Sequence, residues 1–355
     1  MSVCLSHGGR NTYASQAPDE ELHVATLDGV AILRRSAGGW TSAGRALQGK
    51  HISALMIEPK SGMEFAGVHK GGLFASADGG KTWEQRDSGI EHSDVYSLNF
   101  VEAGSELRLY AGTEPAHLYV STDLGKSWRD LPTLRTVGSV DAWTFPAPPH
   151  VGHVKHITFD PTSPDKIYAS IEVGGLLKSE DAGRTWRDLS GFYEDVHRCV
   201  IRPSQPSQMY VTGGEGVYYS GDEGETWEHI TDRTARIAYP DALLIHPDQQ
   251  QLVFMAGSIC SPNGWRTTHD ADSRIARSAD GGRSWEYLTN GLPDHIRGNI
   301  EALAMNTWQG GTSLFGGTTD GDVFASDDGG QTWKTIANGL PPVSKSGHYR
   351  NLQVA

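Results

Sequence analysis

The sequence has few cysteines and no long apolar run. Its three cysteines, Cys4, Cys199 and Cys260, are too widely spaced for a disulfide framework or a CxxC metal site. No stretch approaches the roughly 18 apolar residues of a membrane span. Residues 1–19 also lack the basic start and apolar segment of a secretory signal. These absences predict a reducing compartment, which we expect to be the cytoplasm.

Basic residues are also scarce. The chain has 30 Lys and Arg against 43 Asp and Glu, a formal net charge of −13. Nucleic acids and anionic membrane surfaces attract proteins with a basic face, so neither is expected as a partner. A small molecule or a glycan is the expected substrate.

Glycine and aromatic residues, by contrast, are abundant. Gly accounts for 43 of 355 residues, about 12% against a usual value of about 7%. The chain also has 10 Trp, 12 Tyr and 9 Phe. This combination is typical of many short strands joined by tight turns.

One motif, Ser-x-Asp-x-Gly-x-Thr/Ser-Trp, organises the chain. Its six copies are Ser76–Trp83, Ser121–Trp128, Ser179–Trp186, Ser220–Trp227, Ser278–Trp285 and Ser326–Trp333. A degenerate seventh copy, Arg35–Trp40, precedes them, and the tryptophans lie 43, 45, 58, 41, 58 and 48 residues apart. Periods of 40–50 residues with several strand-like runs are typical of propeller blades.

The chemistry of the motif favours a structural role. Asp can accept hydrogen bonds from the N–H groups of its own turn, and Gly supplies a positive φ. The Trp that follows can pack between blades. We therefore expect the motif carboxylates to stabilise the fold rather than to catalyse a reaction.

The six copies resemble the Asp-box (BNR) repeat of sialidases, xyloglucanases, sortilin-type receptors and photosystem II assembly factors. The resemblance covers the chain from about residue 22 to its end and implies an all-β fold, a single seven-bladed β-propeller of four-stranded blades. Because these families have unrelated activities, it does not imply one function.

The seventh blade is expected to combine both ends of the chain. Residues 1–21 are assigned to an N-terminal tail and 22–355 to the propeller. Glu21–Gln48 would share a sheet with His348–Ala355, whose pattern resembles a first strand. Pairing of N- and C-terminal strands in one blade would remove the open edges of the array. Deletion of 347–355 is then expected to unfold the protein.

Alignment of the inner strands places two columns of side chains at the mouth of the channel. The first column is His51, Asp94, His153, Asp195, Tyr239, Asn299 and His348. The second, two positions further on, is Ser53, Tyr96, Lys155, His197, Asp241, Glu301 and Arg350. Strand side chains alternate with a period of two, so both columns share a face.

This ring is chemically suited to a metal or to acid–base catalysis. Imidazole and carboxylate bind divalent transition metals, and the predicted ligands are His51, His153, His348 and Asp94. A polar funnel without metal is the alternative interpretation. His197, Asp195, Asp241 and Glu301 are the predicted catalytic residues, because imidazoles and paired carboxylates act as acids and bases.

Loops on the same face are predicted to bind substrate. The two long blades carry their extra residues in 135–150 and 258–274, and each insertion contains a tryptophan. Long loops in a compact fold are often functional. The predicted substrate-binding residues are Trp143, Trp265, His69, Glu114, Glu172 and Arg350.

Three function classes fit these observations. The preferred hypothesis is an enzyme whose site lies in the top-face funnel, acting on a small organic or sugar-like molecule with a His/Asp-bound metal. The second is an Asp-box glycoside hydrolase that uses paired carboxylates. The chain lacks the Arg-Ile/Leu-Pro segment of sialidases, and it has one propeller where xyloglucanases have two. The third is a non-catalytic propeller that binds a protein.

Overall fold

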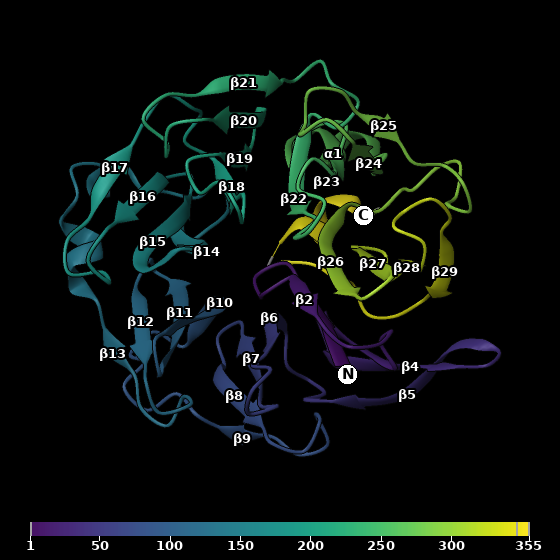
Figure 1. The fold of residues 1–355 in the computed structure, drawn as a ribbon, viewed down its shortest axis with the longest axis horizontal. Coiled ribbons are helices and arrows are strands. Elements are labelled where there is room, and N and C mark those ends of the chain that lie inside the picture. Colours follow the sequence, from purple (N-terminus) through teal and green to yellow (C-terminus); the bar gives the residue numbers. More distant parts are fainter. Residues whose placement is uncertain (1, 346, 354–355) are drawn as a thin grey trace.

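Seven β-sheets stand in a ring around a central axis in a computed structural model of the chain (Figure 1). The structure describes residues 2–345 and 347–353. Six sheets have four strands and one has five. The predicted seven-bladed β-propeller is therefore confirmed.

Each blade runs from an inner strand at the channel to an outer strand at the rim. The inner strands are β1 (Ser2–Leu5), β6 (Ile52–Ile57), β10 (Asp94–Ala103), β14 (His153–Asp160), β18 (Val196–Ile201), β22 (Tyr239–Ile245) and β26 (Ile300–Trp308). The second strands are β3 (Glu21–Thr26), β7 (Glu64–Val68), β11 (Glu106–Glu114), β15 (Ser163–Glu172), β19 (Met209–Gly213), β23 (Val253–Ser258) and β27 (Gly311–Thr318).

The outer half of each blade is shorter. The third strands are β4 (Gly29–Ser36), β8 (Gly72–Ser76), β12 (Leu118–Ser121), β16 (Gly175–Ser179), β20 (Gly216–Ser220), β24 (Arg274–Ser278) and β28 (Val323–Ser326). The outer strands are β5 (Gly39–Ala46), β9 (Glu84–Gln85), β13 (Arg129–Asp130), β17 (Arg187–Leu189), β21 (Glu228–Thr231), β25 (Glu286–Tyr287) and β29 (Lys334–Ala337). The remaining elements are β2 (Thr12–Ala14), η1 (Pro132–Thr136), η2 (Val140–Ala142), α1 (Pro262–Thr268) and η3 (His348–Leu352).

The hydrophobic core is divided among the interfaces between neighbouring blades. Every residue of β6 is buried, because blades cover both faces of this strand. Between the second and third blades, Phe65 and Leu98 pack with the motif residue Trp128. The motif tryptophans thus help to hold blades together, as their position in the repeat predicts.

The Asp boxes form the turns between the third and outer strands. In the first box, Asp78 accepts hydrogen bonds from Ser76 Oγ at 2.9 Å, Thr82 N at 2.9 Å and Thr82 Oγ1 at 2.6 Å. Gly80 has a φ of +77°, and its carbonyl accepts the indole N–H of Trp83 at 2.9 Å. The other five boxes repeat the carboxylate contacts. Their acids therefore stabilise turns.

Strands from both ends of the chain close the ring, as expected, but the details differ from the prediction. β2 pairs in parallel with β26 of the C-terminal blade. The inner strand of the first blade is β1, which pairs in parallel with β3, so residues 1–21 contribute strands and not only a tail. The expected C-terminal strand is wrong: His348–Leu352 forms η3, and residues 354 and 355 lie outside the described residues.

The segment between β1 and β2 crosses the channel. Gly8 N donates to Ser53 O at 3.2 Å, and Gly8 O accepts from Leu98 N at 2.9 Å. Arg198 Nη2 donates to His7 O at 2.6 Å. These contacts tie residues 6–10 to the second, third and fifth blades, so the N-terminal segment fills the channel.

Candidate functional site

A β-bulge recurs near the start of six inner strands and orients the second predicted column. The register with the neighbouring strand skips one residue in each of these strands. The skipped residues are Ser53, Tyr96, Lys155, His197, Asp241 and Glu301. Bulges redirect side chains and often lie beside active sites. The repeated bulge explains why these positions converge on one end of the channel.

The converging side chains form a buried ionic cluster closed by a residue of the C-terminal segment. Lys345 Nζ lies 3.0 Å from Glu172 Oε1 and 3.0 Å from Asp241 Oδ1, and it is almost fully buried. Lys155 Nζ is 2.7 Å from the same Glu172 oxygen. Burial alone would raise the pKa of Glu172, but the two ammonium groups outweigh burial and lower it. The cluster therefore holds ionised carboxylates that already have cationic partners.

The repeat gives no indication of Lys345. The residue follows the last Asp box and occupies no repeated position. Its backbone N–H also donates to Glu301 Oε2 at 2.8 Å, and His348 Nδ1 lies 2.8 Å from Glu301 Oε1. Asn299 Nδ2 donates to Asp241 Oδ2 at 2.6 Å. Asp241 and Glu301, two of the predicted catalytic residues, are thus occupied by contacts within the protein.

The four predicted metal ligands lie near the top of the channel, but they have separate partners. His51 Nε2 is 3.2 Å from Ser344 O, and Asp94 Oδ1 is 2.8 Å from His69 Nδ1. His153 Nε2 is 2.7 Å from Glu172 Oε2, and the carboxylates beside it raise its pKa although burial lowers it. Among the described residues, two groups have ligand atoms that all lie within 4.8 Å of one another. One group is Glu172, Asp195 and His197, and the other is Asp241, Glu301 and His348. A bound metal stays a prediction.

A pocket of about 830 Å³ lies above this cluster. The insertion between the third and fourth blades forms one wall with Phe145 and residues 146–149, and Tyr193 and Tyr239 contribute aromatic side chains. Four predicted substrate-binding residues line the pocket: His69, Glu114, Glu172 and Arg350. The sequence thus placed four of the six predicted residues around one pocket but did not indicate Phe145, Tyr193 or Tyr239 as its aromatic residues.

The two tryptophans predicted to bind substrate do not line this pocket. Trp265 of α1 is fully buried and packs edge-on against His348, with ring centroids 5.4 Å apart. Trp143 donates its indole N–H to Ser139 Oγ at 2.9 Å and packs on the core of the fourth blade. Both insertions fold back on themselves, so these tryptophans support the loops and leave Phe145 and the tyrosines to face the pocket.

Asp195 and His197 form a dyad at the pocket wall. His197 Nδ1 donates to Pro240 O at 2.8 Å, which leaves Nε2 directed at Asp195 Oδ1, 3.4 Å away. Asp195 Oδ1 is itself buried and has no hydrogen-bond partner among the described residues, whereas the side chain as a whole is 15% exposed. Burial alone would raise the pKa of Asp195, but the positive charge of His197 outweighs it, so the pKa is lowered. Asp195 is therefore a carboxylate that can contact a ligand.

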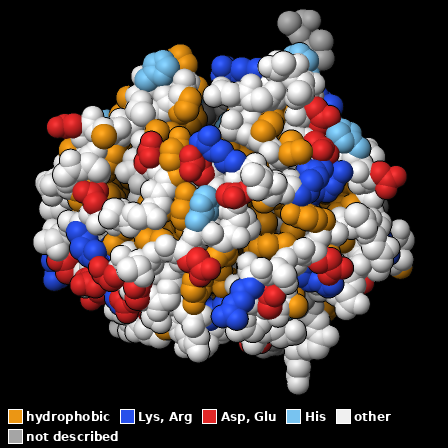
Figure 2. Space-filling model, turned by 90° about the horizontal axis from the view of Figure 1, so that it is seen from above, with side chains coloured by type: hydrophobic (Ala, Val, Ile, Leu, Met, Phe, Trp, Pro, Cys, Tyr) orange, Lys and Arg blue, Asp and Glu red, His pale blue; other side chains and the backbone are white. Residues whose placement is uncertain are grey.

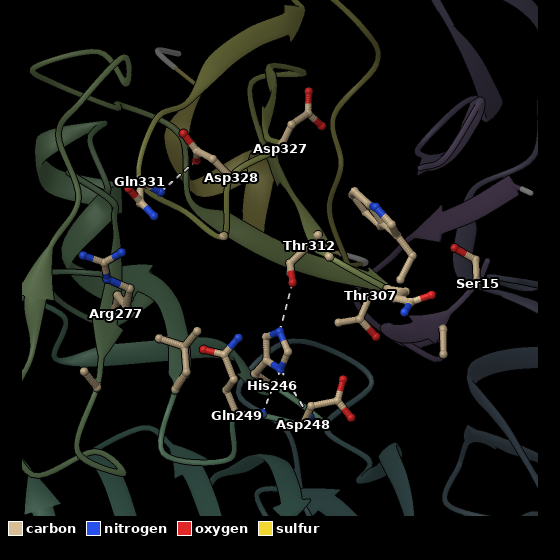
Figure 3. A pocket seen from close by; sticks show the side chains of 18 of the residues that line it. Ser15, His246, Asp248, Gln249, Arg277, Thr307, Thr312, Asp327, Asp328 and Gln331 are labelled. Atoms are coloured by element: carbon tan, nitrogen blue, oxygen red, sulfur yellow. Dashed lines mark hydrogen bonds between the residues drawn. The ribbon is translucent and has the colours of Figure 1, made fainter. Parts of the chain in front are cut away.

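A second cavity, larger than the top-face pocket, lies elsewhere in the molecule. A groove of about 1270 Å³ lies between the sixth and seventh blades, on the Asp-box face (Figure 3). His246 in this groove has Nε2 2.9 Å from Thr312 Oγ1, and its Nδ1 accepts from the backbone of Gln249 at 3.1 Å (Figure 3). Asp328 accepts from its own box. With these groups engaged, the groove offers less acid–base chemistry than the smaller top-face pocket.

The edge of the ring that Figure 2 shows carries side chains of both charges. On this edge, acidic and basic side chains alternate with apolar ones. In the described residues, we find no helix whose length and apolarity would allow it to cross a membrane.

Comparisons with protein families support the repeat assignment. Residues 324–335 match the BNR/Asp-box repeat, and residues 174–298 match the Sortilin-Vps10 family (sortilin, neurotensin receptor 3). A xyloglucanase of a Paenibacillus species is 24% identical over 276 residues, which cover 68% of this chain and 26% of that protein. Vacuolar protein sorting/targeting protein 10 of Aspergillus flavus is 29% identical and covers 39% of this chain and 10% of that protein. The chain spans about a quarter or less of these relatives.

Solved structures share the propeller. The GH74 enzyme of Niastella koreensis matches with a TM-score of 0.62 and 19% identity over 92% of this chain and 54% of that one. The structure described as YCF48 bound to D1 peptide matches with a TM-score of 0.52 and 18% identity over 92% and 88%. At these identities the similarity shows a shared fold alone. The chain is an Asp-box (BNR) repeat β-propeller, similar to xyloglucanases and to sortilin-like sorting proteins.

Proposed function

We propose that the top-face pocket is the active site of a glycoside hydrolase-like enzyme that acts on a glycan. The Asp195 carboxylate at the pocket wall carries this proposal, because it is ionised, partly accessible and not engaged by a lysine. Aromatic side chains such as Tyr193 and Phe145 suit the apolar face of a sugar ring. The xyloglucanase relatives favour this class over the other function classes.

Asp195 is assigned the role of general base. Hydrolysis of a glycosidic bond needs one group that takes a proton from the attacking water and one that protonates the leaving oxygen. The positive charge of His197 favours the ionised form of Asp195. The carboxylate takes the proton of a water, the water oxygen bonds to the anomeric carbon, and the bond to the leaving oxygen breaks.

His69 is assigned the role of general acid. Its ring lines the pocket, and its Nδ1 lies 2.8 Å from Asp94 Oδ1. A carboxylate in this position orients the ring and its second nitrogen, as in other His–Asp pairs. In its protonated form the ring donates its Nε2 proton to the leaving oxygen.

Leaving-group dependence tests both roles. Wild type and the variants Asp195→Asn and His69→Gln are assayed on paired glycosides with an alcohol or a dinitrophenol leaving group. Asp195→Asn should lose roughly 10²–10⁴-fold on both, the usual contribution of a general base. His69→Gln should lose as much on the alcohol glycoside and little on dinitrophenyl glycosides, which need no protonation to leave. Inactivity of the wild type across neutral and acidic glycosides would reject the enzyme.

Peptide binding is the second candidate. The match to sorting proteins and the likeness to a propeller bound to a peptide favour it. The same pocket would then bind a peptide without cleaving it. This function would be supported if the wild type were inactive on every glycoside but retained a peptide from a random library. The variant Tyr193→Ala should then lose the peptide.

A further inference from the structure

The exposed charge around the top-face pocket is positive, although the chain as a whole is acidic. Lys70, Arg233, Arg266 and Arg350 all line the pocket and are exposed. The lining acids lie deeper, with side-chain exposures of 9% for Glu114, 1% for Glu172 and 15% for Asp195. A ligand that enters from the top therefore meets guanidinium groups before it meets carboxylates.

Acids of the surrounding top-face loops have basic partners of their own. Asp28 Oδ2 lies 2.6 Å from Arg45, and Glu215 Oε1 lies 2.6 Å from Arg233. Asp320 is bound by Arg297. These three acids are thus compensated by arginines.

Two of the arginines have only neutral partners among the described residues. Arg266 on α1 donates from Nε to Asn351 Oδ1 of η3 at 2.9 Å. Arg350 on η3 donates from Nε to Tyr349 Oη at 3.3 Å. The Asn351 contact holds Arg266 beside the element that carries Arg350. Both guanidinium groups therefore have free N–H donors at one side of the pocket, which suits bidentate binding of an anion.

We propose that Arg266 and Arg350 form an anion subsite, so that the pocket takes a sugar that carries a carboxylate. This inference rests on the proposed function for the sugar, but the anion subsite has its own test. Guanidinium groups match the planar carboxylate geometry of a uronic acid. The positive rim would also attract such a ligand into an otherwise acidic protein.

Matched ligands isolate the contribution of the anion. Binding of methyl β-D-glucuronide, methyl β-D-glucoside and glucose 6-phosphate to the full chain is measured by calorimetry at low salt. Charge-assisted hydrogen bonds contribute roughly 1.5–3 kcal/mol, so the glucuronide should bind about 10- to 100-fold more tightly than the glucoside. The preference should shrink at high ionic strength. Tighter binding of the phosphate would keep the anion subsite and assign it to phosphorylated sugars.

Variants locate the subsite. Arg266→Gln/Arg350→Gln should abolish the preference for the glucuronide over the glucoside. Arg277→Gln, on the opposite face of the ring, should keep it. Equal binding of glucuronide and glucoside by the wild type, or a preference that survives in the double variant, would overturn the inference. A preference for the glucuronide without hydrolysis of any glycoside would reject the proposed hydrolase activity but keep the anion subsite. If none of the three ligands bound, both the hydrolase activity and the anion subsite would be rejected.

Discussion

Replacement of Lys345 by Met tests whether the buried ionic cluster stabilises the propeller. The Met side chain retains most of the apolar stem but removes the ammonium that lies 3.0 Å from Glu172 and 3.0 Å from Asp241. At an effective dielectric constant of about 20, each contact corresponds to roughly 5 kcal/mol of Coulomb energy before desolvation. Loss of one partner of a buried ion pair usually costs about 3–5 kcal/mol, because a charge remains buried without compensation.

The expected loss can be measured by urea unfolding and by thermal melting. With an unfolding entropy of about 2.1 cal/mol/K per residue, the 355-residue chain should melt about 4–7 °C lower. Lys60→Met is the matched control, because Lys60 is exposed and pairs with Glu102 at the surface. The control should change stability by less than about 1 kcal/mol.

The pH dependence adds a second criterion. The lysines lower the pKa of Asp241 against the effect of burial, so its ionised form stabilises the folded state at neutral pH, and this contribution is lost as pH falls. Without Lys345 that pKa rises, and the variant can neutralise the cluster by taking up a proton. The stability difference should therefore be largest near pH 7 and narrow toward pH 4.

A double variant separates the ion pair from packing. Lys345→Met/Asp241→Asn removes both charges and should recover at least about 1.5 kcal/mol relative to Lys345→Met alone. A loss below about 1 kcal/mol in the single variant, or a loss that does not change with pH, would refute the electrostatic interpretation.

Three further predictions concern the fold. Gly9→Ala should lower the free energy of unfolding in urea by about 2–3 kcal/mol, because the added Cβ would lie 1.8 Å from a carbonyl oxygen of β6. Gly38→Ala is the control, because a Cβ at Gly38 has space. Equal effects of the two substitutions would contradict a tightly packed channel. The hydrogen bonds of its box outweigh burial and lower the pKa of Asp123 to about 2. Asp123→Asn should therefore lose more unfolding free energy relative to the wild type at pH 5 than at pH 2.5. A loss that is the same at both pH values would contradict this contribution of the box. Deletion of 2–14 should abolish cooperative melting, whereas deletion of 347–355 should leave a cooperative transition at a lower temperature. If instead only the deletion of 347–355 abolished cooperative melting, the C-terminal segment and not the N-terminal strands would close the ring.

The sequence was sufficient for the fold where its signals are local. An Asp box specifies a turn through contacts within a few residues, so six copies located six blades, and the degenerate copy Arg35–Trp40 indicated the seventh. The inner strand β1 could not be found this way, because it pairs in parallel with β3 and has no hairpin that ties it to the first blade. The C-terminal alternation resembled a strand, but Leu352 instead packs with Trp265 in a small cluster of its own.

The site was predictable only where it follows the repeat. The aligned inner strands placed Asp195, His197 and Asp241 at one end of the channel, and the bulge that recurs in these strands explains why His197 and Asp241 converge there. Repetition gives no information about how an insertion folds, and so Trp265 was assigned to the pocket although it is fully buried. Repetition also could not indicate Lys345, whose ammonium determines which acids are available for chemistry.

The two terminal segments together restrict where chemistry can occur. Residues 6–10 fill the channel, and Lys345 sits at its upper end between Glu172 and Asp241. Most of the acids at this end of the channel already contact a lysine or histidine of the protein. Asp195 differs because its partner His197 lies at 3.4 Å without a hydrogen bond and its side chain remains partly accessible. Loss of Asp195 should therefore affect catalysis more than stability, whereas loss of Asp241 should do the opposite.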